Sequence, residues 1–275
     1  MSDSEFLLCE DDLEDEYTEE QEEDNVLTVS YSRLRTLSQS PRKYKRVYID
    51  KIKDEDTQAT SLGKAIHKAI LEPENFKKDY YIIPKPDRRT KAGKLAYAGA
   101  VDQAAENKQS LLYEHEAQKC QEAAKIVREH PLAGPLLKGA MSEVDLTWEI
   151  EPGLNGRAIL DFYNPEVQAI GEVKVFSGMY KPYRFAGKAK EECYHVQAGW
   201  YHKAANVLEL PVKDYYFLLV SAGRDPEVAV ARADQEFIQR GGLKADLLCK
   251  ELVERIESNN WTSYEELLTV GYVPW

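Results

Sequence analysis

Closely spaced cysteines are missing from this chain. Its four cysteines are far apart in the sequence: Cys9, Cys120, Cys193 and Cys249. Structural zinc sites and disulfide frameworks require cysteines at short, regular spacings, so the sequence argues against both. Widely separated thiols fit a reducing compartment such as the cytoplasm.

Long apolar runs and N-terminal basic residues are missing as well. No run reaches the roughly 18 apolar residues of a membrane-spanning helix. The N-terminus is acidic, whereas a signal peptide begins with basic residues. We therefore expect neither a membrane span nor a secretion signal.

Positive charge is absent from the first 24 residues, which hold 13 of the 48 acidic residues and none of the 36 basic ones. The rest of the chain is therefore nearly neutral, although the net charge of the whole is −12. A segment so rich in charge cannot bury enough apolar surface to order itself. We predict a disordered acidic arm over residues 1–25. Because no repeat or linker is evident beyond it, we predict a single domain over residues 26–275.

Two apolar segments in the middle of the chain, residues 156–163 and 169–175, carry three charged residues of interest. Their β-branched and apolar residues predict strands, and the Asn-Pro-Glu sequence between them predicts a turn. A hairpin centred on residues 166 and 167 would place Asp161 nearly opposite Glu172. Because side chains alternate along a strand, Glu172 and Lys174 would share one face.

Clustered carboxylates in an apolar sheet repel one another and lose solvation, unless a cation lies between them. Mg²⁺ prefers a few carboxylates and retained waters. We therefore expect Asp161 and Glu172 to bind Mg²⁺, for which Mn²⁺ would substitute, with the carbonyl of Val173 as a further ligand. A bound metal beside a protonated Lys174 suits phosphodiester hydrolysis, which needs an activated water and relief of charge on the phosphoryl oxygens. The alternative for Glu172 and Lys174 is a surface salt bridge.

The remaining elements follow from hydrophobic periodicity and turn residues. We expect strands at residues 26–29, 143–150, 214–221 and 228–233, and helices at residues 30–37, 61–71, 91–107, 113–130, 191–208 and 235–258. Glu143, at the edge of its strand, is a candidate for an additional metal ligand. The order of helices, strands, helix and strands predicts an α/β fold.

Several motifs resemble a known family. Asp161 followed by Glu172-Val-Lys174 resembles the signature of PD-(D/E)XK nucleases, and His195-Val-Gln197-Ala-Gly-Trp-Tyr201 resembles the QxxxY helix of RecB-type members. Over about residues 28–270 the chain is more specifically similar to RecE-type exonucleases of phage and prophage (exodeoxyribonuclease VIII-like). The supporting motifs are Ser30-Tyr-Ser-Arg-Leu34, Leu62-Gly-Lys-Ala-Ile-His67, Leu71-Glu-Pro-Glu-Asn-Phe76 and Arg88-Arg-Thr-Lys-Ala-Gly-Lys94.

The resemblance implies a restriction-endonuclease-like core, with a mixed central sheet flanked by helices. It also implies catalytic roles for Gln197 and Tyr201, because the QxxxY helix abuts the metal site in this family. His67 would contact the metal. For His67 and Tyr201, simple packing in the core is the alternative.

Basic residues form three clusters, at residues 33–53, 85–94 and 181–190, and tyrosines are interleaved in the first. Such a mixture suits a surface that binds phosphates, although an ordinary solvated helix face is equally compatible with it. The candidate DNA-binding residues are Arg42, Arg88, Arg89, Lys181 and Arg184. Arg88 and Arg89 are the candidates for a 5′ phosphate, because the arginine fork matches phosphate oxygens.

From the resemblance we expect a Mg²⁺-dependent exonuclease that degrades double-stranded DNA from its ends, 5′ to 3′, in the cytoplasm of a bacterial cell or phage-infected host. It would be a homo-oligomeric ring that leaves 3′ single strands for an annealing protein of the RecT type. The alternatives are a RecB-like nuclease of different polarity in repair or defence and a non-catalytic DNA-binding or scaffold protein. The acidic arm would improve solubility, mimic DNA phosphates or dock a partner.

Overall fold

The computed structural model describes residues 26–52, 58–176, 181–223 and 226–262. The predicted acidic arm lies outside the described residues. Within the part of the chain that is described, no helix is both long enough and apolar enough to cross a membrane.

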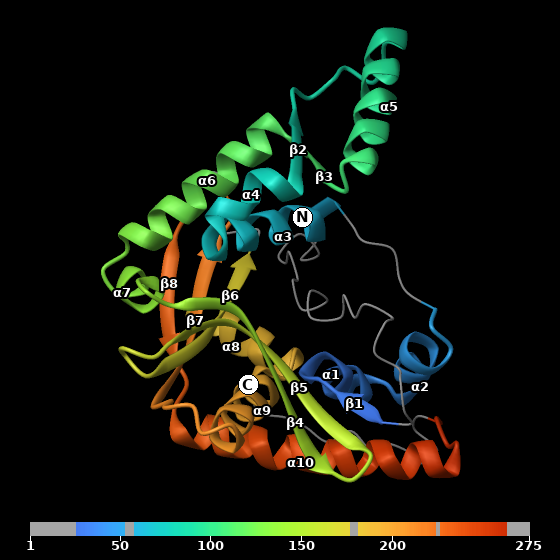
Figure 1. Cartoon of the computed structure of the whole chain (residues 1–275), viewed down its shortest axis with the longest axis vertical. Helices are drawn as coiled ribbons and strands as arrows, with labels where there is room; N and C mark the ends of the chain where they lie inside the picture. The colour runs from blue at the N-terminus through green and yellow to red at the C-terminus, as the bar shows by residue number, and fades with distance from the viewer. Residues whose placement is uncertain (1–25, 53–57, 177–180, 224–225, 263–275) are drawn as a thin grey trace.

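A six-stranded mixed sheet forms the centre of the fold (Figure 1). Strands β4 (Met141–Glu151) and β5 (Leu154–Asn164) form a long antiparallel hairpin. The first residues of β5 pair in parallel with β1 (Leu27–Val29), and its last residues pair antiparallel with β6 (Ala169–Phe176). The predicted strands on both sides of the turn at residues 165–168 are confirmed.

The sheet continues from β6 to β7 (Asp214–Ser221), which is parallel to it, and ends at the antiparallel strand β8 (Val228–Arg232). All eight residues of β6 are buried because helices cover both faces of the sheet. Its side chains alternate between the two layers. Val173 and Val175 join the core beneath α3 and α6, whereas Glu172 and Lys174 face the layer of α8 and α9.

Two layers of helices complete the fold. One layer consists of α3 (Gln58–Leu71), α4 (Pro73–Asp79), α6 (Glu114–Glu129) and α7 (Ala133–Leu137). The other contains α1 (Tyr31–Gln39), α2 (Pro41–Tyr44), the π-helical turn η4 (Lys45–Ile49), α8 (Pro182–Glu191), α9 (Tyr194–Val207) and α10 (Gln235–Ser258). This arrangement is the expected mixed sheet flanked by helices.

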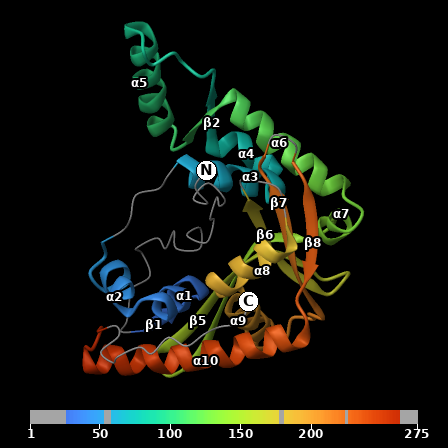
Figure 2. The same cartoon turned by 180° about the vertical axis from the view of Figure 1, so that it is seen from behind.

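A small two-stranded parallel sheet lies outside the main one. It pairs β2 (Tyr80–Ile83) with β3 (Ser110–Tyr113), and α5 (Lys91–Glu106) connects the two strands. Figures 1 and 2 both show α5 projecting from the end of the molecule that is remote from α10. Neither strand was expected from the sequence.

The prediction of one helix over residues 191–208 was wrong at its start. Cys193 has a φ of 58°, in the left-handed region, which a right-handed helix excludes. The chain therefore turns at this residue, and α8 and α9 are separate helices.

Helix α9 packs closely against α10, and glycine makes this possible. A Cβ atom at Gly199 would overlap the backbone of Gly242, and one at Gly241 would overlap the carbonyl of His195. The crossing fixes the position of α9, which contributes two polar side chains to the site described next.

Candidate active site

Three side chains from three separate elements meet at the middle of β5. They are His67 from α3, Glu143 from β4 and Asp161 from β5. His67 Nε2 lies 2.8 Å from Asp161 Oδ2, and His67 Nδ1 lies 3.6 Å from Glu143 Oε1. One ligand atom from each residue falls within 4.8 Å of those of the other two. His67 and Asp161 are buried, whereas the side chain of Glu143 is 38% exposed, so the cluster opens to solvent on the side of β4.

Asp161 lies where the pairing of β5 with β6 ends. The last paired residues, counted from the turn, are Phe162 and Gly171. Asp161 and Glu172 are the next residues along the two strands. Beyond that point Asp161 Oδ2 accepts a hydrogen bond from the backbone N–H of Val173 at 2.6 Å. The carboxylate therefore takes the place of a backbone acceptor at the point where the strands separate. The register agrees with the predicted position of Asp161 nearly opposite Glu172.

The pKa values of the two carboxyl groups of the cluster shift in opposite directions. Partial burial, followed by the negative charge of Asp161, raises the pKa of Glu143 to about 7. Burial also opposes ionisation of Asp161, but the charge of His67 and its hydrogen bond outweigh it and lower the pKa of Asp161. Glu143 has a φ of 52° although it lies in a strand. A left-handed backbone in a residue with a side chain is uncommon and often found at functional sites.

A second polar group adjoins the first on the other side of β6. Gln197 Nε2 donates to Glu172 Oε2 at 2.9 Å and contacts the hydroxyl of Tyr201 at 3.4 Å. Lys174 Nζ is 3.5 Å from Glu172 Oε2 and 4.9 Å from the centre of the Tyr194 ring. Both contacts favour a positive charge on Lys174.

Burial decides between the two interpretations of Glu172 and Lys174. They are only 2% and 7% exposed, respectively, so they do not form a surface salt bridge. Burying a charged pair costs several kcal/mol of solvation, which the pair only partly recovers. Tyr201 is fully buried, so it packs in the core as the alternative expected, and its hydroxyl also contacts Gln197.

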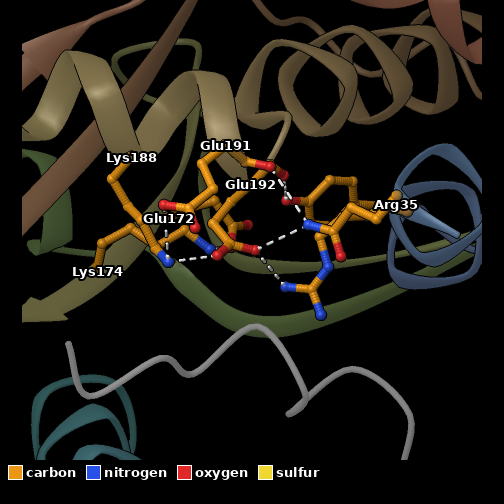
Figure 3. A network of polar contacts seen from close by, with 8 residues as sticks. Arg35, Glu172, Lys174, Lys188, Glu191 and Glu192 are labelled. Carbon is orange, nitrogen blue, oxygen red and sulfur yellow. Dashed lines mark hydrogen bonds and ion pairs between the residues drawn. The ribbon is translucent and has the colours of Figure 1, made fainter. Parts of the chain in front are cut away.

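A chain of charged side chains continues from this group towards α1 (Figure 3). Lys188 of α8 forms ion pairs with Glu192 and, at 3.6 Å, with Glu191. Glu192 also binds Arg35 Nη1 at 3.2 Å, and its backbone carbonyl accepts from the hydroxyl of Tyr31 at 2.5 Å. Helix α1 is thereby joined to the turn that precedes α9.

The donor set of the first cluster fits a divalent cation. Its two carboxylates suit a hard ion such as Mg²⁺, its imidazole is a common ligand of transition metals, and the carboxylates repel each other when no cation lies between them. Glu172, which we predicted as a ligand, contacts Lys174 and Gln197 and is not one of the three clustered residues. Val173 contacts Asp161 through its N–H group, and the predicted role of its carbonyl stays a prediction.

The predicted DNA-binding residues lie on separate parts of the molecule. Arg42 is exposed on α2, and Lys181 and Arg184 are at the start of α8. Arg88 and Arg89 are exposed just before α5, where Arg88 lies 4.2 Å from the centre of a tyrosine ring and Arg89 Nε is 3.1 Å from Asp87. Figure 1 shows α2 and α5 far apart.

Sequence reasoning missed the charged residues that support the site. Arg35 and Glu192 are 157 positions apart, so no local pattern relates them. The only available signal was the spacing of four residues between Lys188 and Glu192, which suits an ion pair on a helix.

Comparisons with known proteins identify the family and the fold of this chain. A structure of a "putative exonuclease" from Eubacterium rectale matches the fold with a TM-score of 0.57, at 13% sequence identity, over 84% of this chain and 82% of the other. No curated protein sequence matches. The model of one protein family, described as a PDDEXK-like domain of unknown function (DUF3799), matches residues 30–266. Because the match covers most of the sequence, the chain belongs to this PDDEXK-like family and is a member of the PD-(D/E)XK nuclease superfamily.

Proposed function

We propose that this protein is a metal-dependent DNA exonuclease that acts on the ends of double-stranded DNA. The observation that carries the proposal is the position of Asp161. It contacts His67 and, through the N–H of Val173, the strand that bears Glu172 and Lys174. The family and the fold support phosphodiester hydrolysis as the class of reaction.

Asp161, Glu143 and His67 would hold the metal, with Glu172 and the carbonyl of Val173 as further proposed ligands. Mg²⁺ is the proposed ion because it prefers carboxylates, and Mn²⁺, which shares this preference for oxygen ligands, would substitute. When bound, such a metal makes a water nucleophilic at neutral pH and neutralises charge on the phosphoryl group.

The side chains around Glu172 have complementary roles in this proposal. Lys174 orients the attacking water or stabilises the negative charge that develops on the phosphoryl oxygens. Gln197 holds the Glu172 carboxylate through its amide N–H. Tyr201 in turn positions Gln197 from within the core.

DNA phosphates would contact Arg42, Lys181 and Arg184, and a 5′ phosphate would contact Arg88 and Arg89. The resemblance to RecE-type enzymes supports digestion from 5′ to 3′ by a ring-shaped homo-oligomer, which leaves 3′ single strands for an annealing protein of the RecT type. A closed ring would repeat the basic residues around the DNA axis and would require a free end for entry.

The test is digestion of linear and covalently closed circular duplexes, with and without Mg²⁺. Linear duplexes labelled at one end report polarity, and the mass of the protein in solution reports assembly. We expect linear DNA alone to be cut, only with metal, and the 5′ label to be released first. Early release of the 3′ label would instead indicate a RecB-like nuclease of different polarity. DNA binding without cleavage under any metal would indicate a non-catalytic protein.

A further inference from the structure

Lys188 is a buried cation beside the proposed catalytic strand, and the chemistry described above does not use it. Figure 3 shows Lys188, Glu191 and Glu192 next to Glu172 and Lys174. We propose that Lys188 binds a backbone phosphate of the DNA strand, adjacent to the phosphate that is cleaved, and that Glu192 and Arg35 hold its ammonium group in place. This inference rests on the proposed nuclease function and names a substrate-binding residue of the same site.

Stability alone does not account for these charges. The side chains of Lys188, Glu192 and Arg35 are 9%, 11% and 7% exposed, respectively. Removing such charges from water costs several kcal/mol for each ion, and well-packed apolar residues often replace buried ion pairs with no loss of stability. A lysine in the last turn of a helix, as Lys188 is in α8, gains too little from the helix dipole to offset that cost.

Glu192 is held firmly enough to position Lys188. Its carboxylate accepts from Arg35 at 3.2 Å, and its backbone carbonyl accepts from the hydroxyl of Tyr31 at 2.5 Å. Both partners, Arg35 and Tyr31, belong to α1. The side chain and the main chain of Glu192 are therefore held by hydrogen bonds from the same helix. An ammonium group has three donors, so Lys188 is able to bond to Glu192 and to a second acceptor at the same time.

Glu191 is the contact that a phosphate would replace. Its carboxylate is 3.6 Å from Lys188 Nζ, and its side chain is 68% exposed. An ion pair of this length with a carboxylate that lies in solvent contributes little. A DNA phosphate has the same sign of charge and accepts hydrogen bonds in the same way. Glu191 therefore competes with DNA for Lys188, whereas Glu192 supports it.

The experiment compares Lys188→Met with Glu191→Gln in steady-state cleavage of a linear duplex at several salt concentrations. We expect Lys188→Met to raise KM about tenfold, with little change in kcat, and to reduce the slope of log KM against log salt by about one. Lys188→Arg should restore part of the affinity. Glu191→Gln should lower KM about twofold at low salt, where surface charges are least screened.

Asp246→Asn provides the matched control. It removes a carboxylate that lies 2.5 Å from Lys203, in a contact between α9 and α10 away from the nuclease site. Its KM should equal that of the unmodified protein. Glu191 and Asp246 are both at least 47% exposed, so these two variants should fold even where Lys188→Met does not.

Opposite effects on KM separate DNA binding from a structural role. If the ion pairs only stabilise the fold, the Lys188 and Glu191 variants will both lower Tm and leave KM unchanged, and the inference is overturned. A fall in kcat alone in Lys188→Met would also overturn it, because it would place Lys188 in the chemical step. An unmodified protein that neither binds nor cuts DNA would instead contradict the proposed function itself.

Discussion

At the scale of single residues, Asp161 joins the cluster of His67 and Glu143 to the strand that bears Glu172 and Lys174. It touches His67, lies opposite the β6 strand and accepts from Val173. Its neighbours Glu172 and Lys174 are buried with it. Burying an acid or a lysine costs stability, so such groups side by side in the core point to a functional role.

Asp161→Asn, Glu172→Gln and Lys174→Met should each reduce DNA cleavage by about a hundredfold or more, because each removes a charge that serves the transition state. All three replacements keep the approximate shape of the side chain. The fold, followed by circular dichroism, should therefore survive. The measurement is the rate of digestion of a linear duplex in Mg²⁺. Digestion by the Asp161 variant at the normal rate would show that the metal site has been misplaced.

The raised pKa of Glu143 gives a second prediction, made for the metal-free protein in a chelator. A carboxyl group whose pKa rises on folding from its ordinary 4.5 to about 7 lowers the free energy of unfolding as the pH rises between these two values. At higher pH the free energy of unfolding stays at this lower level. Glu143→Gln has no such loss. It should therefore be more stable than the unmodified protein at pH 8, by about 1 kcal/mol after allowance for solvent screening of a partly exposed group.

Thermal unfolding at pH 5 and pH 8 measures this difference. At pH 5 the two proteins should unfold at similar temperatures, because Glu143 is then protonated in the folded state. Added Mg²⁺ should raise the Tm of the unmodified protein more than that of the variant, because a ligand that binds the folded state stabilises it. A variant less stable than the unmodified protein at pH 8 would contradict the raised pKa of Glu143, to which burial and then the charge of Asp161 contribute.

At the scale of secondary-structure elements, the crossing of α9 and α10 controls the site from a distance. Gly241→Ala should destabilise the protein by about 1–3 kcal/mol, because the new Cβ atom overlaps the carbonyl of His195 and the helices must separate. Cleavage should fall as well, since Gln197 and Tyr201 lie on α9. Chemical denaturation and the digestion assay measure the two effects.

The matched control is Gly99→Ala in α5, where an added Cβ atom meets nothing within 4 Å. This variant should gain roughly 0.5–1 kcal/mol from the higher helix propensity of alanine. Equal stability of the two variants would mean that α9 and α10 are not constrained at their crossing.

At the scale of the whole molecule, the distribution of charge matters more than its sum. Residues 1–24 hold 13 acidic residues and no basic ones, whereas the rest of the chain is nearly neutral. If this segment competes with DNA for the basic clusters, its deletion should tighten DNA binding and raise activity, most strongly at low salt. Salt titrations of the binding constant for the full-length and shortened proteins provide the measurement. Identical titrations would leave only roles in solubility or partner docking.

The sequence alone determined the features that depend on neighbouring residues. A strand at residues 214–221 and a helix at residues 235–258 were predicted with the bounds that the structure shows, because side-chain periodicity is a local property. The hairpin between β5 and β6 likewise placed Asp161 near Glu172, since a short turn fixes the register of the strands that it joins. The helical spacing of Gln197 and Tyr201 predicted their shared face.

Only the tertiary structure decided which distant residues complete the site. His67 and Glu143 approach Asp161 because α3 packs on the sheet and β4 pairs with β5. The sequence offered both as candidates but could not place them in one cluster with Asp161. The link from α1 to the turn before α9 had no sequence signal at all. Contacts between residues far apart depend on how whole layers pack, and packing is a collective property that no local pattern of residues records.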